Sequence, residues 1–228
     1  MTEYSLHFEL KDWYTVSGDQ LEVAVEDFRV DILRGKLIIE IQTGNFTAIR
    51  KKLIKLLLNN QVRLVFPVAK LKWIVHMSRS GEFVRRRKSP KKGKLIDVFQ
   101  ELVHAPCLIK NRNFSLEVLL IEEEEVRCSD DAGSWRRRGV SVKDRKLLKV
   151  FDRIVFRDNQ DFLQFLPKEL HGHFTNKVLA LKLGISIRLA QKITYCLRKM
   201  GVICIVGKKR NEILYQVSQN SLHKPFEE

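Results

Sequence analysis

The hydrophobic repeat changes several times before residue 77, and this order of helical and strand patterns restricts the fold more than any other feature. Residues 4–14 place apolar side chains at the spacing of one helical face. Residues 20–43 then alternate as three short strands around a tight Arg34-Gly35 turn, and residues 46–58 return to the helical repeat. Two further strands, VRLVFPV and LKWIVHM, follow. This order predicts an α/β domain in which a strand after the second helix joins the first three in one mixed sheet.

The net charge indicates the kind of partner. The 228 residues carry 42 Lys and Arg against 27 Asp and Glu, a formal charge of +15 with a sequence pI of about 9.8. Such an excess favours a polyanion, and DNA is the expected partner. No apolar run is long enough to span a membrane, and the first residues do not form a signal peptide. We therefore expect a cytoplasmic protein without membrane association. The four cysteines lack the spacing of a disulfide framework or zinc site.

Basic residues are most concentrated in residues 78–94. This stretch holds eight Lys and Arg and one acid, mixed with Ser, Pro and Gly. The composition predicts a loop or a disordered arm that grips a phosphate backbone without packing into a core. The residues expected to make these contacts are Arg85, Arg86, Arg87 and Lys88.

The remaining patterns set the expected domain boundaries. A helix is predicted at 95–105 and a strand at 114–122, followed by the acidic Glu122–Glu125 cluster and then a loop that ends in Trp135-Arg136-Arg137-Arg138. We expect an N-terminal domain over 1–126 with its core at 4–77, a linker or helix over 127–159, a second domain over 160–217 and a tail over 218–228.

Residues 160–217 have the pattern of a helix-turn-helix followed by a hairpin. Thr175 and Ser186 are side chains that cap helix starts, and Gly184 between them favours a tight turn. After the last helix, two apolar strands flank the basic run Gly207-Lys208-Lys209-Arg210-Asn211. This arrangement resembles the winged-helix family, including its wing.

The winged-helix resemblance implies a set of DNA contacts. The last helix would lie in the major groove and the wing on the backbone. A winged helix that binds a protein remains the alternative. The residues that the resemblance places near DNA are Arg188, Gln191, Lys192 and Tyr195 on the helix, and Lys208, Lys209 and Arg210 on the wing.

Two carboxylates lie among apolar residues of the expected hairpin. Asp31 is in the middle of one strand and Glu40 in the next, and the Arg34-Gly35 turn brings the two strands together. Burying such groups is costly unless a cation pairs them. Oxygen ligands suit Mg²⁺ or Mn²⁺, so the pair predicts a divalent metal site.

The Asp, hairpin, Glu-x-Gln pattern over residues 4–77 resembles the PD-(D/E)XK nuclease superfamily, whose members are restriction-endonuclease-like enzymes. The resemblance implies that Asp31 and Glu40 hold the metal that activates water for phosphodiester hydrolysis. Gln42 stands where the family usually has Lys, and it would orient that water without supplying charge. Glu9 matches a family acid on the first helix, with Glu22 as the competing residue. Phosphates would be held by Lys36, Arg50 and Lys51.

Three functions remain open at this point. The first is a Mg²⁺-dependent DNA endonuclease of repair, recombination or defence, and the second is a non-catalytic DNA-binding protein or regulator on a nuclease-like scaffold. RNA binding is the third, because phosphate attraction is shared by both nucleic acids. The sequence has no P-loop, so ATP-driven remodelling would need a separate ATPase or helicase partner, and a nuclease that cuts both strands would favour a homodimer.

Overall fold

The computed structural model describes residues 4–132, 139–167, 170 and 172–218. The expected tail therefore lies outside the described residues except for Ser218. The chain divides into two units, and each is built from several segments. Unit 1 comprises Met1–Gly44, Arg63–Asp97 and Glu117–Ile154. Unit 2 comprises Asn45–Val62, Val98–Leu116 and Val155–Glu228.

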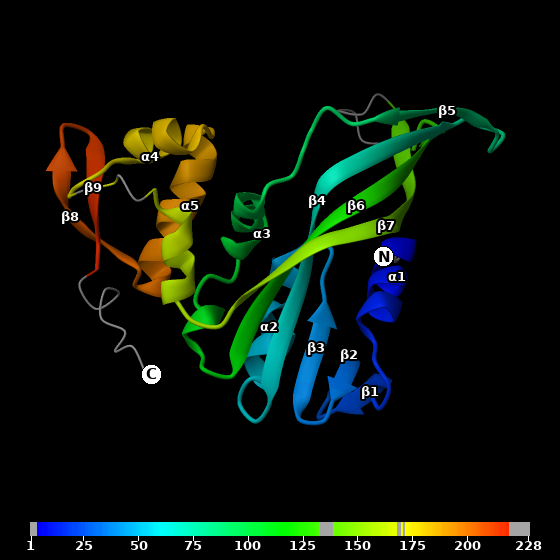
Figure 1. Ribbon diagram of the computed structural model, residues 1–228, viewed down its shortest axis with the longest axis horizontal. Helices are drawn as coiled ribbons and strands as arrows, with labels where there is room; N and C mark the ends of the chain where they lie inside the picture. Colours follow the sequence, from blue (N-terminus) through cyan, green and yellow to red (C-terminus); the bar gives the residue numbers. More distant parts are fainter. Residues whose placement is uncertain (1–3, 133–138, 168–169, 171, 219–228) are drawn as a thin grey trace. The chain divides into compact units, whose positions relative to one another are not determined.

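A seven-stranded sheet dominates unit 1 within the described residues (Figure 1). The strands run in the order β1-β2-β3-β4-β6-β7, and β5 pairs with β4 beyond this path. Their bounds are β1 Gln20–Val25, β2 Phe28–Arg34, β3 Leu37–Ile41, β4 Gln61–Met77, β5 Phe83–Lys88, β6 Phe114–Ser129 and β7 Val140–Phe156. The protein thus has the expected α/β class, with a mixed sheet and flanking helices.

The predicted three-strand meander is confirmed, and its turn explains the register. Gly35 has a φ of 57°, a left-handed conformation that glycine adopts without strain, so a two-residue turn joins β2 to β3. The register then pairs Arg34 with Leu37 and Ile32 with Ile39.

Helix α1 (Ser5–Tyr14) covers one face of this sheet. Its helical spacing brings Leu6, Leu10 and Tyr14 to one side, where they are buried. The core that they join includes Ile32, Ile39, Ile41, Val65, Leu119 and Ile121.

The structure corrects four expectations in unit 1. Residues 78–94 are not simply an arm, because β5 pairs antiparallel with β4 and aligns Trp73 with Lys88. The two strands expected near residues 62–77 are one strand, β4. The strand expected at 114–122 continues through the acidic cluster to Ser129 as β6, and most of the expected linker at 127–159 is β7. The expected loop end at residues 135–138 lies outside the described residues. Cations on an outer strand lie in solvent while their backbone pairs, so charge alone does not exclude a strand.

Unit 2 contains two helices joined by a short turn and then a hairpin, in the expected order. Thr175 caps α4 (Asn176–Leu183), Gly184 ends it with a φ of 60°, and Ser186 caps α5 (Ile187–Met200). The two helices cross, and the antiparallel strands β8 (Ile203–Lys209) and β9 (Glu212–Val217) follow (Figure 1). Phe174, just before α4, also pairs with Tyr215 of β9.

The core of unit 2 extends beyond the expected domain at 160–217. Phe156 is stacked on Phe165, with ring centroids 5.5 Å apart, and Phe99 contacts the same ring at 4.9 Å. Phe99 begins α3 (Phe99–Leu102), and Phe165 ends the 3-10 helix Gln160–Phe165. Helix α2 (Phe46–Leu56) also belongs to this unit, so the helix-turn-helix is built into a larger core.

Candidate nucleic-acid interface

At the expected metal site in unit 1, Asp31 already has partners from the protein itself. Asp31 immediately precedes Ile32 and Glu40 immediately follows Ile39, and these two isoleucines are paired in the hairpin as expected. However, Oδ2 of Asp31 accepts the Ile41 N–H at 2.8 Å. Oδ1 lies 3.2 Å from His7 Nε2 and 3.6 Å from Lys11 Nζ. Both carboxylate oxygens therefore already face donors.

Lys11 connects Asp31 to a second acid. Its side chain is 6% exposed and forms an ion pair with Glu22, which also pairs with Arg29 at 2.7 Å. Burial acts to raise the pKa of Asp31, but hydrogen bonds from His7 and the Ile41 N–H, together with the Lys11 charge, hold this pKa below its ordinary value. Asp31 is thus an ionised partner of a buried lysine.

The other residues expected in catalysis have separate partners. Oε2 of Glu9 accepts the Leu147 N–H at 2.5 Å, which links α1 to β7. The Gln42 side-chain amide donates to the Gly44 carbonyl in its own loop. Glu40 is buried, and Lys36 lies in the exposed β2–β3 turn. Within the described ranges, no group of three or more His, Cys, Asp or Glu could hold a metal ion.

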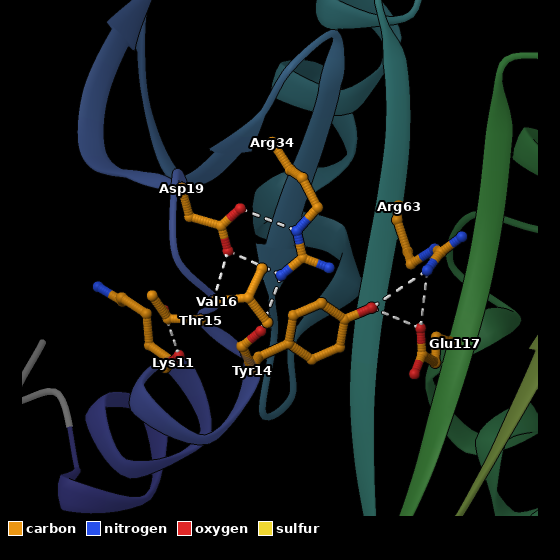
Figure 2. A network of polar contacts seen from close by, with 8 residues as sticks. All are labelled: Lys11, Tyr14, Thr15, Val16, Asp19, Arg34, Arg63 and Glu117. Atoms are coloured by element: carbon orange, nitrogen blue, oxygen red, sulfur yellow. Dashed lines mark hydrogen bonds and ion pairs between the residues drawn. The ribbon is translucent and has the colours of Figure 1, made fainter.

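A neighbouring polar network in unit 1 joins α1 to the sheet (Figure 2). The Tyr14 hydroxyl donates to Oε2 of the fully buried Glu117 at 2.6 Å, and Nη1 of Arg63 donates to the same Oε2 at 3.3 Å. Arg34 donates to both carboxylate oxygens of Asp19 at 2.8 and 2.7 Å, and to the Tyr14 carbonyl at 2.8 Å. Arg34 of β2 thus holds the end of α1 and the Asp19 loop that follows it.

The acidic cluster of β6 forms ion pairs with cations of β4, β7 and β6 itself. Lys72 Nζ lies 2.6 Å from Glu123 and 2.9 Å from Glu125, both of which are buried. Further ion pairs join Arg127 to Glu125 at 2.6 Å and Arg145 to Glu123 at 2.5 Å. Much of the positive charge in this part of unit 1 is therefore internally balanced.

The strand β5 carries a partly balanced basic surface. Arg86 pairs with Glu124 at 2.6 Å, and its guanidinium lies 4.0 Å from the Trp73 ring centroid. Arg85 and Arg87 are exposed. Burial chiefly, and then the charges of Arg85, Arg87 and Arg127, lower the pKa of His76. This strand keeps its backbone in the sheet while presenting cations to solvent.

Helix α5 in unit 2 has one buried face and one polar, exposed face. Leu189, Ile193, Cys196 and Leu197 are buried. Arg188, Gln191, Tyr195 and Arg198 are exposed at the spacing of a single helical stripe. Lys192, another expected contact residue, donates its ammonium hydrogens to the Gln100 carbonyl and side chain at 3.2 and 3.3 Å. Arg198 was not among the expected contact residues, although its helical spacing from Tyr195 could have been read from the sequence.

The hairpin after α5 has the expected basic tip. Lys208 and Lys209 end β8, and Arg210 lies in the turn with a φ of 55°. All three side chains are exposed. Lys209 is aligned with Glu212, and Glu212 forms an ion pair with Lys177 of α4. The tip therefore presents cations, and Glu212 beside it ties this end of the hairpin to α4.

Helix α2 contributes further cations to unit 2. Arg50 and Lys51 are exposed on it, and Arg50 lines a pocket together with Tyr195 and Lys199 of α5. The sequence had assigned Arg50 and Lys51 to the nuclease-like domain. The structure places them in the same unit as α5 and the hairpin.

The comparisons with known proteins give the family. Residues 4–157 match the model described as "Domain of unknown function (DUF8091)". The chain belongs to the DUF8091 family. A protein of Treponema pallidum (strain Nichols) described as "Uncharacterized protein" is 30% identical over 216 residues, covering 94% of this chain and 85% of its own. No solved structure matches.

The DUF8091 match ends just after β7, so α4, α5 and the hairpin lie beyond the family model. The alignment with the Treponema protein covers more of the chain and extends into these elements. The similarity between the two proteins is therefore not restricted to the DUF8091 segment. No described helix has both the length and the apolar character needed to cross a bilayer.

Proposed function

We propose that this protein binds double-stranded DNA through unit 2, with α4, α5 and the β8–β9 hairpin acting as a winged-helix module, and that it does not cleave the DNA. One observation carries the proposal. The exposed polar stripe of α5 and the consecutive cations of the hairpin tip belong to one unit. A groove-reading helix and a backbone-contacting hairpin need this combination of surfaces.

The stripe on α5 supplies suitable chemistry for DNA. Arg188 and Gln191 lie in the first half of the helix. An arginine donates in pairs to guanine and a glutamine makes a matching pair of bonds with adenine in the major groove. Lys208, Lys209 and Arg210 carry charge without a fixed geometry, which suits phosphates. The helix thus accounts for base contacts and the hairpin for sequence-independent affinity.

Metal-dependent DNA hydrolysis in unit 1 is less well supported. It would require Asp31 and Glu40 to share Mg²⁺ or Mn²⁺, with Gln42 directing water. Asp31 is instead surrounded by Lys11, His7 and the Ile41 N–H, so a divalent ion would have to displace a buried lysine. The donors present fit a structural ion pair, and they do not fit the expected metal site.

A salt titration tests the proposed function. The logarithm of the affinity for a blunt duplex should fall linearly with the logarithm of salt concentration. Replacing Lys208, Lys209 and Arg210 together by Ala should lower this slope by up to about 2.7, because each phosphate contact contributes about 0.9 on duplex DNA. A variant that keeps the full slope would refute the hairpin contact.

Two single substitutions provide a matched control. Arg210→Ala and Lys36→Ala each remove one exposed cation from a hairpin turn, the first in unit 2 and the second in unit 1. We expect Arg210→Ala to lower the slope by about 0.9 and Lys36→Ala to leave it unchanged. Incubation of the DNA with Mg²⁺ or Mn²⁺ completes the test. Cleavage that disappears in Asp31→Ala would support the nuclease instead.

A further inference from the structure

A pocket of about 590 Å³ lies within unit 2, between α2, residues 103–111 and the second half of α5. This volume falls within the range of about 300–1,000 Å³ that is usual for small-molecule sites. Much of the lining is apolar and comes from two segments. The apolar side chains include Ile54, Leu57, Val103, Ala105, Pro106 and Leu108.

The polar side chains that line the pocket are cationic or neutral. Arg50 enters from α2 and Lys199 from α5, and the described lining contains no Asp or Glu. Glu101, close in sequence to the lining, instead accepts the Phe46 N–H at 3.2 Å. An anionic group on an otherwise flat, apolar ligand would therefore match the pocket.

Tyr195 gives the pocket an aromatic wall. Its side chain is 39% exposed although it belongs to a helix whose opposite face is buried. The Arg198 guanidinium and the Lys199 ammonium lie 6.0 and 5.9 Å from its ring centroid. An exposed ring flanked by cations is the combination on which nucleic-acid bases stack while their phosphates are neutralised.

We propose that this pocket binds a single unpaired nucleotide, with its base against Tyr195 and the apolar side chains and its phosphate near Arg50 and Lys199. The inference rests on the proposed function, because α5 carries both the DNA-binding stripe and the pocket. Tyr195 follows Arg188 by about 10 Å along the helix, from the rise of 1.5 Å per residue. This distance is about three base steps, so a strand that leaves the duplex beside Arg188 can reach the pocket.

The first test compares a blunt duplex with the same duplex carrying one unpaired terminal nucleotide. The wild-type protein should prefer the unpaired end by at least about five-fold, the lower end of what an aromatic stack contributes. Thr47→Trp should abolish this preference, because Thr47 is an exposed residue that lines the pocket and a larger side chain would fill it. Ala48→Trp is the matched control, since Ala48 is exposed on the same helix but does not line the pocket.

The second test uses thiol alkylation as a direct probe of the pocket. Cys107 lines it and is exposed, whereas Cys204 is exposed on β8 away from the lining. Cys128 and Cys196 are buried, and burial raises the pKa of the Cys196 thiol to about 12, so these two should react slowly. The duplex with an unpaired end should slow alkylation of Cys107 more than that of Cys204.

The outcomes separate the inference from the proposed function. Equal affinity for both duplexes together with unprotected Cys107 overturns the nucleotide pocket, while hairpin-dependent binding of the blunt duplex would still support the proposed function. If deoxyadenosine monophosphate alone protects Cys107 from alkylation, a free nucleotide supplies the base and the phosphate that the pocket recognises. A preference that survives Thr47→Trp, with the helical content of that variant unchanged, also overturns the assignment.

Discussion

Removing the Tyr14 hydroxyl should destabilise the protein measurably, because this hydroxyl donates a hydrogen bond to a fully buried carboxylate. In Tyr14→Phe the buried Glu117 loses a hydrogen bond of 2.6 Å, while Arg63 remains 3.3 Å from the same oxygen. The ring itself stays in the core with Leu6 and Leu10. The substitution therefore tests a single polar contact without creating a large cavity.

The expected loss follows from the charge and burial of the acceptor. Hydrogen bonds to charged groups contribute about 1.5–3 kcal/mol to stability. Glu117 retains Arg63, so we expect about 2 kcal/mol, which lowers Tm by about 4–8 °C for a chain of this size. Thermal unfolding followed by circular dichroism measures the change. Tyr195→Phe is the control, because its exposed hydroxyl should change stability by less than about 0.5 kcal/mol.

An alkaline titration adds a second readout. Burial chiefly, and then the neighbouring Glu117, raise the pKa of Tyr14 above its ordinary value of 10.0. The folded state thus holds this proton more tightly than the unfolded chain. The resulting stability is complete below pH 10 and is lost as the pH rises through the folded pKa, so wild type and Tyr14→Phe should converge in alkali. Equal stability of the two proteins at neutral pH would refute the role of the hydroxyl.

Two further predictions follow from the charged networks. Asp31→Asn should destabilise the protein by about 1.5–3 kcal/mol at neutral pH. The difference should disappear in acid, because a carboxyl with a lowered pKa contributes stability only until the falling pH protonates it in the folded state; urea unfolding at several pH values measures this, and an unchanged difference at low pH would contradict it. On β5, Arg85→Ala with Arg87→Ala should lower the salt slope of DNA binding by up to about 1.8, whereas Arg86→Ala should lower it less because Glu124 already pairs with Arg86. Equal slopes in wild type and the double variant would show that β5 does not contact the backbone.

The elements that the sequence predicted correctly are those with local causes. The β2–β3 turn depends on Gly35, and the helix-turn-helix depends on Thr175, Gly184 and Ser186, each of which acts within a few residues. Such signals can be seen in a short window of sequence. They located α1, α2, α5 and the terminal hairpin without any tertiary information.

The missed strands lack a clear period because they lie toward solvent. In β5 every side chain is exposed, and in β7 buried and exposed residues do not alternate cleanly. Charges are tolerated on both sides of such strands, so the expected alternation of apolar and polar residues is absent. The pairing of β5 with β4 decides the structure instead.

The candidate site depended even more on distant contacts. Asp31 and Glu40 were correctly placed on neighbouring strands, but the groups that surround Asp31 come from α1 and no local pattern connects them to β2. Similarly, Glu117 pairs with Tyr14 across 103 positions of sequence. A buried carboxylate predicts that a cation or donor is present, whereas only the fold determines whether it is a metal or a lysine.

The distribution of charge, rather than its sum, supports unit 2 as the proposed DNA interface. In unit 1, Lys72, Arg127 and Arg145 are used by the buried acids of β6. In the described part of unit 2, Arg188 and Arg210 are exposed and form no ion pair. A paired cation must lose its acid before it can hold a phosphate, whereas an exposed and unpaired one only releases water and counterions. For this reason the hairpin tip and the α5 stripe should dominate the salt dependence, with Arg85 and Arg87 as the principal contribution from unit 1.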